Sequence, residues 1–170
     1  QSFYLKGDYP AAAKALELEV GKVTAAGKVP TEVQFKLLAD AQRRTKDEAG
    51  STRTVELLVR HYPSKANWGT LVQRLWAKPS LAVRLQLDVF RLQQAVAGLS
   101  EASDFTEMAE LALQAGSAAE ALKAMEQGYA AGVLGTGDKV AEQQRFKDKV
   151  TKLVAEDRAT LEKDLTNAKK

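Results

Sequence analysis

The sequence predicts an all-α protein, and three observations lead to that prediction. Residues with high helix propensity, among them alanine, leucine, lysine and glutamate, are abundant in the chain. Apolar residues recur at intervals of three and four, which is the period of a helix with one buried face. The four prolines, Pro10, Pro30, Pro63 and Pro79, lie between these periodic segments. No segment shows the alternation of apolar and polar residues that is typical of a β-strand.

The expected helices begin close to the start of the chain. The first runs from about Pro10 to Val20. The second runs from about Thr31 to Lys46, with its threonine as a candidate N-cap. The third, from about Ser51 to His61, is expected to stop before Pro63, because the residue that precedes a proline disfavours helical geometry.

Two helices are expected in the middle of the chain. A short one spans about Asn67 to Ala77, and a longer one follows Pro79, since proline suits a first helical turn, where its missing N–H needs no partner. Gly98 lies where the apolar pattern fades and marks the expected end of the longer helix. The apolar residues of this helix recur at steps of four and three: Leu81, Leu85, Val89, Leu92, Val96 and Leu99.

Three further helices complete the chain. Two of similar length, about Ser103–Ala115 and Ala118–Ala131, form a pair divided by Gly116-Ser117. The last, about Asp138–Asn167, is strongly charged, and Asp138 is its expected N-cap. Its apolar stripe is irregular and lacks the heptads of a coiled coil. We expect this helix to cap the preceding pair, with dimerisation through it as the alternative.

The helix pairs carry an internal repeat. Phe35 and Phe105 occupy equivalent positions 70 residues apart, which corresponds to two periods of about 34 residues. Small residues are expected where paired helices cross closely. The positions in register are Leu38, Ala39, Gln42, Ser51 and Val55 after the first phenylalanine, and Met108, Ala109, Ala112, Ala121 and Met125 after the second. Partial units are carried by Trp68, Leu71, Val72 and Leu75, and by Gly7-Asp8-Tyr9 with Ala12 and Leu16.

In this pattern the chain resembles the tetratricopeptide-repeat family, in a bacterial form, over roughly residues 1–133. The matches are degenerate, because Gln42 and Ala112 stand where an aromatic residue is usual. The resemblance implies an α-solenoid, a right-handed superhelical stack of antiparallel helix pairs, closed by a long C-terminal helix. We expect repeats over residues 1–137, beginning inside a repeat, and a capping helix over residues 138–170. The alternative fold is a non-repetitive helical bundle.

The resemblance also implies a function in binding other proteins, because the first helices of successive pairs line a concave groove. The chain is therefore predicted to bind a peptide or protein of unknown identity. Some members of the family clamp a C-terminal carboxylate with lysine and asparagine. Asp40, in place of the asparagine, argues against that role. The positions carried over as groove residues are Lys36, Asp40, Arg43, Arg44, Gln73, Trp76, Glu107 and Glu110.

Motifs for catalysis or cofactor binding are weak, so we predict a protein that is not an enzyme. Gly21–Lys28 has the wrong glycine spacing for a phosphate-binding loop and is interpreted as a turn between helices. The Gly132–Asp138 loop lacks the strand that precedes a dinucleotide fingerprint. His61 is the only histidine and cysteine is absent, so we expect no metal and no cofactor.

Charge and hydropathy restrict the partners further. The 25 basic and 22 acidic residues are interspersed, so no concentrated basic face for nucleic acid is expected. No apolar run reaches the roughly 18–20 residues of a membrane span. The chain opens without methionine and contains no thiol, and we favour a processed protein of the bacterial periplasm or envelope over a cytoplasmic one. Two alternative functions stay open, a structural part of a larger envelope protein and a helical domain that binds a small ligand.

Overall fold

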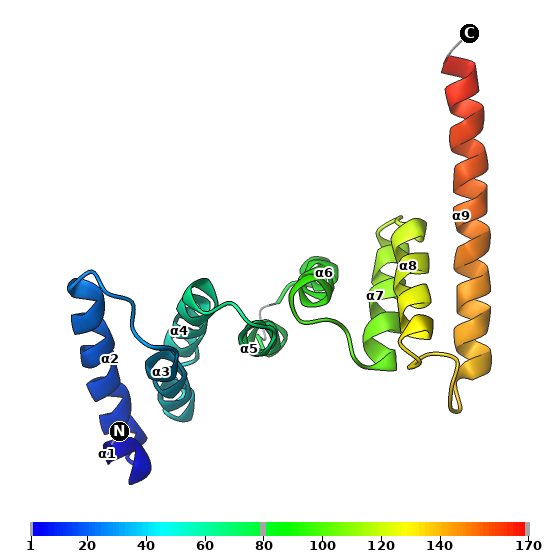
Figure 1. The fold of residues 1–170 in the computed structure, drawn as a ribbon. Helices are drawn as coiled ribbons and strands as arrows, with labels where there is room; N and C mark the ends of the chain where they lie inside the picture. The colour runs from blue at the N-terminus through cyan, green and yellow to red at the C-terminus, as the bar shows by residue number, and fades with distance from the viewer. Residues whose placement is uncertain (1, 79–80, 169–170) are drawn as a thin grey trace. The chain divides into compact units, whose positions relative to one another are not determined.

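The computed structural model describes residues 2–78 and 81–168 and confirms the prediction of an all-α protein (Figure 1). Every regular element in these two ranges is helical. The elements are α1 (Ser2–Leu5), α2 (Tyr9–Ala25), α3 (Glu32–Arg44), α4 (Glu48–His61), α5 (Lys65–Trp76), a 3-10 turn η1 (Val83–Leu85), α6 (Gln86–Val96), α7 (Ala102–Gln114), α8 (Ala118–Ala130) and α9 (Val140–Ala168).

The chain divides into two compact units, which are described separately. The first comprises residues 1–81 and 95–97, and the second comprises residues 82–94 and 98–170. The first unit therefore holds α1 to α5, and the second holds most of α6 together with α7, α8 and α9. The expected division into repeats over 1–137 and a capping helix over 138–170 stays a prediction.

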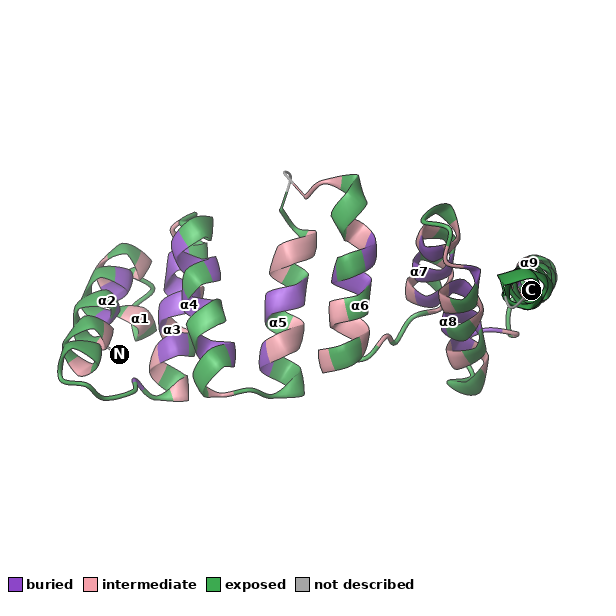
Figure 2. Cartoon of the chain, turned by 90° about the horizontal axis from the view of Figure 1, so that it is seen from above, coloured by how far each residue is buried: buried purple, intermediate pink, exposed green. Residues whose placement is uncertain are grey.

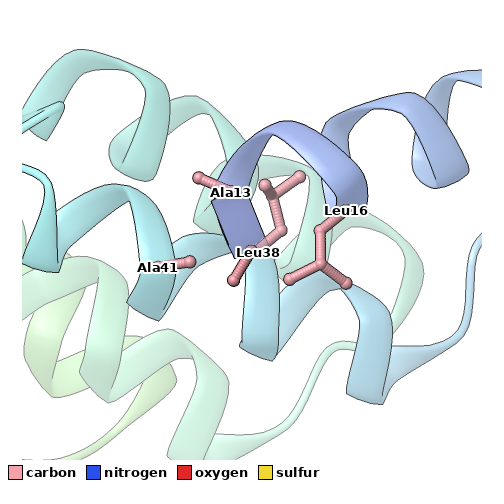
Figure 3. Packing of buried hydrophobic residues seen from close by; sticks show 5 residues of the cluster. Ala13, Leu16, Leu38 and Ala41 are labelled. Atoms are coloured by element: carbon pink, nitrogen blue, oxygen red, sulfur yellow. The ribbon is translucent and has the colours of Figure 1, made fainter. Parts of the chain in front are cut away.

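In the first unit each helix packs on the next one along the chain. Ala13 and Leu16 of α2 meet Leu38 and Ala41 of α3 in one apolar cluster (Figure 3). A second cluster joins α3, α4 and α5 and consists of Ala39, Val55, Val59 and Leu71, with Trp68 packed against it. Buried residues lie on the facing sides of α3 and α4 (Figure 2).

A buried hydrogen bond joins α3 and α4. Ser51 of α4 has no exposed surface, and its hydroxyl donates a hydrogen bond to the backbone carbonyl of Ala39 in α3. Gln42 of α3 is also buried. Its side-chain oxygen accepts a hydrogen bond from Thr54 Oγ1 at 2.8 Å, and its amide donates to Glu17 Oε1 at 2.9 Å. This satisfied amide links α2, α3 and α4.

The turns that lead into α2, α4 and α8 share one hydrogen-bond pattern, which Gly27 and Gly132 repeat at the ends of α2 and α8. Gly7, Lys46 and Gly116 each adopt a positive φ, of 76°, 64° and 77°, before α2, α4 and α8. Each donates its amide to the carbonyl three residues earlier, at 3.1, 3.0 and 3.0 Å. The following residue donates to the carbonyl five residues earlier, at 3.1, 2.9 and 2.8 Å. This is the hydrogen-bond pattern of a helix end closed by a left-handed residue.

The second unit contains the α7–α8 pair, which matches α3–α4 with an offset of 70 residues. Its counterparts of Phe35, Leu38, Ala39, Gln42, Ser51 and Val55 are all buried as well: Phe105, Met108, Ala109, Ala112, Ala121 and Met125. On α6, Arg91 pairs with Glu120 of α8 through two hydrogen bonds of 2.6 Å.

Helix α9 packs on α8 near its first half, where Gln143 and Val150 are buried. Gln143 Oε1 accepts a hydrogen bond from the amide of Gly135 at 2.9 Å, which ties the α8–α9 loop to this helix. The distal half carries exposed leucines, since Leu161 is 60% and Leu165 is 53% exposed. Dimerisation through this helix stays a prediction.

Several expected boundaries were correct, three were wrong, and α4 begins at Glu48, three residues before the expected Ser51. Thr31 caps α3 through a reciprocal capping box with Gln34, and α4 ends at His61 before Pro63, as expected. Helix α2 continues to Ala25 instead of Val20, so most of the Gly21–Lys28 segment is helical and not a turn. Its end is instead closed by Gly27, whose φ is 70°.

The other two errors concern helix starts. The helix expected directly after Pro79, which lies outside the described residues, begins only at Gln86. Ala82 is extended, and Val83 is 71% exposed, so this part of the apolar pattern has no buried face to stabilise a helix. Helix α9 begins at Val140, so Asp138 lies in the preceding turn and is not its N-cap.

A glycine in each unit offers a matched test of this packing. A Cβ on Gly128 of α8 would lie 2.5 Å from Leu134 Cδ1 and 2.9 Å from Phe105 Cγ, whereas a Cβ on Gly21 of α2 would meet nothing within 4 Å. Gly128→Ala is expected to lower the free energy of unfolding by about 1–3 kcal/mol through overpacking. Gly21→Ala is expected to raise it by about 0.5–1 kcal/mol through helix propensity. Urea unfolding of both variants measures this, and equal effects would contradict the packing described.

Candidate functional site

An open groove of about 980 Å³ lies in the first unit, lined by one face of α4 and one face of α5. Its residues come from the first half of α4, the second half of α5 with the two residues that follow it, and the end of α3. The lining residues are Arg43, Glu48, Ala49, Thr52, Arg53, Glu56, Thr70, Gln73, Arg74, Ala77 and Lys78.

The two walls follow from the helical period. Glu48, Thr52 and Glu56 recur every fourth residue along α4, so they share a face. Ser51 and Val55 lie on the neighbouring face, which is buried against α3. In α5 the same period places Thr70, Gln73, Arg74 and Ala77 on the wall of the groove, next to the buried Leu71 and Val72. The apolar contacts of each helix therefore fix the direction of its groove face.

The groove carries more positive than negative charge. Its cations are Arg43, Arg53, Arg74 and Lys78, and its anions are Glu48 and Glu56. Arg43 lies at the end of α3, three of the charges lie on α4, Arg74 lies on α5, and Lys78 follows that helix. The excess of cations favours an anionic group in the groove, although the sequence as a whole has interspersed charge.

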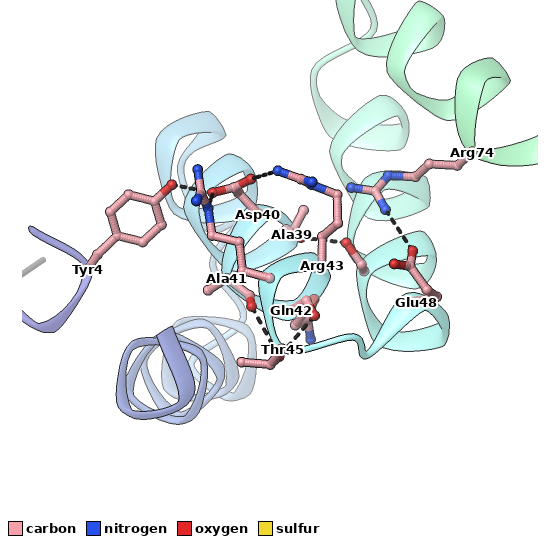
Figure 4. Close-up of polar contacts among 11 residues, drawn as sticks. Tyr4, Ala39, Asp40, Ala41, Gln42, Arg43, Thr45, Glu48 and Arg74 are labelled. Carbon is pink, nitrogen blue, oxygen red and sulfur yellow. Dashed lines mark hydrogen bonds and ion pairs between the residues drawn. The ribbon is translucent and has the colours of Figure 1, made fainter. Parts of the chain in front are cut away.

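Arg74 differs from the other cations because its side chain is only 13% exposed. Its Nε is buried and has no hydrogen-bond partner. The nearest carboxylate is that of Glu48, whose Oε2 lies 3.8 Å from Arg74 Nη1 and whose side chain is 70% exposed (Figure 4). Burial lowers the pKa of the Arg74 guanidinium, and the charge of Glu48 only partly opposes this effect. The groove therefore contains a largely buried arginine whose Nε has no hydrogen-bond partner in the protein.

Asp40 anchors a second polar cluster beside the groove (Figure 4). Its carboxylate accepts a hydrogen bond from the hydroxyl of Tyr4 and pairs with Arg43 Nη2 at 2.7 Å and Arg44 Nε at 2.6 Å. The Arg44 guanidinium also lies 4.5 Å from the ring centre of Tyr9. Partial burial alone would raise the pKa of Asp40, but the hydrogen bonds from Tyr4, Arg44 and Arg43 lower it from 3.8 to about 2.

The structure brings two of the eight predicted groove residues, Arg43 and Gln73, into this groove. Asp40 and Arg44 lie beside it in their own cluster. Lys36 pairs with Glu32 of the same helix at 2.7 Å and does not line the groove. Trp76 is half-buried and is also not a lining residue. The two glutamates, Glu107 and Glu110, are exposed on α7 in the second unit.

Sequence reasoning missed Arg74, Arg53, Glu48 and Lys78 as groove residues. The signal for Arg74 was present, since a single arginine stands within the apolar Leu71–Trp76 segment. It also missed Asn67, which is buried and donates to Glu32 Oε1 at 3.0 Å and to the Tyr62 carbonyl at 2.8 Å. These two bonds fix the start of α5, and thereby the groove wall that this helix provides.

His61, the only histidine in the sequence, packs against an aromatic residue of α3. The ring of His61 stacks on Phe35, with ring centres 6.0 Å apart. Across ranges 2–78 and 81–168, no three His, Asp or Glu side chains group closely enough to hold a metal ion. Over the same ranges, each helix is too short or too polar to span a membrane.

Comparison with protein-family models, with curated proteins and with solved structures gave no match to this chain. The function is therefore argued from the geometry of the groove and from the residues that line it.

The Asp40 cluster predicts a pH-dependent contribution to stability. Asp40→Asn is expected to lower the free energy of unfolding at pH 7 by about 1 kcal/mol, as is typical of a favourable exposed ion-pair cluster. Because folding lowers the pKa of Asp40 from 3.8 to about 2, this contribution is complete above pH 4 and is lost as the pH falls from about 4 to about 2. Urea unfolding at several pH values measures the difference.

Asp157→Asn, at an exposed position of α9, is the matched control and is expected to change stability little at any pH. A difference between the Asp40→Asn variant and the unmodified protein that stayed constant down to pH 2 would contradict the assigned cluster.

Proposed function

We propose that this chain is a protein-interaction module, and that the groove between α4 and α5 binds a segment of another protein. The observation that carries the proposal is the open groove of about 980 Å³, formed by exposed faces of two helices that are anchored on their other sides. Two residues predicted from the sequence to contact a partner, Arg43 and Gln73, line it.

The character of the lining favours a protein segment over a small molecule. Small-molecule sites are mostly apolar, with few polar groups. Six of the eleven lining residues of this groove are charged. A charged and solvent-accessible lining is typical of the polar parts of a protein–protein interface. The same character gives no support to the alternative of a helical domain that encloses a small ligand.

The equivalence of the α3–α4 and α7–α8 pairs is a second, independent support for the proposal. The pairs α3–α4 and α7–α8 have buried residues in the same register, and the turns inside both pairs have the same hydrogen bonds. We infer that these pairs belong to a tetratricopeptide-like array of antiparallel helices, stacked in a right-handed superhelix. Arrays of this kind act through extended binding surfaces. The inferred role is binding and not catalysis.

Filling the groove tests the proposal without changing its charge. Ala49 and Ala77 line opposite walls, and both are exposed. The double variant Ala49→Trp/Ala77→Trp is expected to lose, at least tenfold, the proteins that the unmodified chain captures from an extract of its source cells. Quantitative mass spectrometry of the captured proteins measures this loss.

The matched control is the double variant Ala15→Trp/Ala66→Trp, at two exposed positions of the same unit that do not line the groove. It is expected to capture the same proteins as the unmodified chain. If the groove-filled variant also kept them, the groove would not be the binding site and the proposal would fail.

A further inference from the structure

Arg74 is the group in the groove that most lacks a partner. A guanidinium carries five N–H donors and cannot be deprotonated in a protein. In this structure Nε is buried without an acceptor, and the nearest carboxylate oxygen, of Glu48, lies 3.8 Å from Nη1, beyond hydrogen-bond distance. A buried donor without a partner destabilises the folded protein, and a buried charge needs both a counter-charge and hydrogen bonds.

The position of Arg74 next to buried apolar residues explains why the folded chain tolerates a buried Nε without an acceptor. Leu71 and Val72 bury their side of α5, and Leu71 joins the cluster with Ala39 and Val55. Arg74 follows within the same turn of the helix, and its side chain is only 13% exposed. This burial restricts the side chain and leaves Nε without an acceptor, so an incoming acceptor meets a partly pre-organised group.

A carboxylate matches the unpaired group best. Its two oxygens accept two parallel hydrogen bonds from a guanidinium, and such charge-assisted bonds are shorter and stronger than neutral ones. Glu48 does not fill this place, because its side chain is 70% exposed and its contact with Arg74 is long. An acceptor that enters the groove from outside can displace it at little cost.

Other cations of the groove also favour a negatively charged ligand. Arg53 on α4 and Lys78 just after α5 line the same groove as Arg74. Asp40, which argued against carboxylate binding at the level of sequence, does not line the groove, and two arginines pair with it. Its charge reaches Arg74, but the pairing with Arg43 and Arg44 offsets much of the repulsion that an acid in the groove would meet.

We propose that the groove selects an acidic segment of a partner protein, and that the guanidinium of Arg74 receives one of its carboxylates. This inference rests on the proposed function and names the chemistry of the partner. An aspartate or glutamate side chain pairs with Arg74, and neighbouring acidic residues lie near Arg43, Arg53 and Lys78.

A protein segment fits the groove better than a nucleic acid. A nucleic acid presents a phosphate at every nucleotide, and binding needs a row of cations without intervening anions. Glu48 and Glu56 also line the groove and interrupt such a row. A polypeptide carries its acids on flexible side chains, which can turn away from these glutamates toward Arg74, whereas the phosphates of a nucleic acid are part of its backbone.

Fluorescence anisotropy with a labelled hexaglutamate peptide tests the inference, with hexaglutamine as the neutral peptide. The unmodified chain is expected to bind hexaglutamate at least tenfold more tightly than hexaglutamine at low salt. Arg74→Gln is expected to weaken hexaglutamate binding roughly tenfold to hundredfold, since it removes charge-assisted hydrogen bonds. Arg60→Gln, at an exposed position of α4 outside the groove, removes the same charge and is expected to change affinity less than twofold.

Arg74→Lys distinguishes lost binding from lost folding. It keeps the positive charge but removes the paired N–H donors of the guanidinium. It is expected to bind hexaglutamate more weakly than the unmodified chain, with an unchanged circular-dichroism spectrum. Equal loss in the Arg74→Gln and Arg60→Gln variants would overturn the inference in favour of diffuse attraction. Equally tight binding of hexaglutamine, or tighter and Arg74-dependent binding of a six-nucleotide single strand, would also overturn it.

The outcomes separate this inference from the proposed function. If the groove-filled variant loses its captured proteins while Arg74→Gln keeps full affinity for hexaglutamate, the groove binds proteins but does not select acids through Arg74. If the groove-filled variant keeps its captured proteins, the proposed function fails, whatever the peptide shows.

Discussion

The close contact between α3 and α4 at Ser51 is the interaction on which the first unit depends. Ser51 has no exposed surface and donates its hydroxyl to the carbonyl of Ala39, so the two helices approach where only small side chains fit. Val55 continues the same buried face of α4, and Leu71 of α5 joins its cluster. The contact therefore sets the position of α4, and α4 in turn positions α5 and the groove between them.

The groove shows how apolar packing can hold a polar group ready for binding. Arg74 lies on the same helical turn as the buried Leu71 and Val72. Its Nε is therefore buried with them, although it has no hydrogen-bond acceptor. The free-energy cost of that arrangement is borne by the apolar contacts of α5. Asp40 is the contrasting case, because it has three partners, including Arg43 and Arg44, and acts as a structural anchor. Asp40 is thus paired within the protein, whereas Arg74 is the group that we propose to bind a carboxylate from a partner.

Helical period and capping residues allowed much of the fold to be predicted from the sequence. Thr31 and Pro63 bound their helices as expected, because local backbone chemistry determines such ends. The start of α6 could not be predicted, since the apolar pattern around Val83 continues where no partner helix buries it. At the groove, Arg43 and Gln73 followed from the repeat register. Arg74 did not, because an apolar pattern records spacing and does not show how a charge within it is paired.

The most direct test of the central claim, that an acid binds at Arg74 in the groove, is the NMR signal of the Arg74 Nε–H group. In a ¹H–¹⁵N correlation spectrum this signal is expected to move saturably on addition of hexaglutamate, together with the backbone amides of the groove-lining residues within ranges 48–56 and 70–78. The amides of residues 150–168 in α9 are expected to stay in place. An Arg74 Nε–H signal that does not move at saturating peptide, or shifts confined to α9, would contradict the claim.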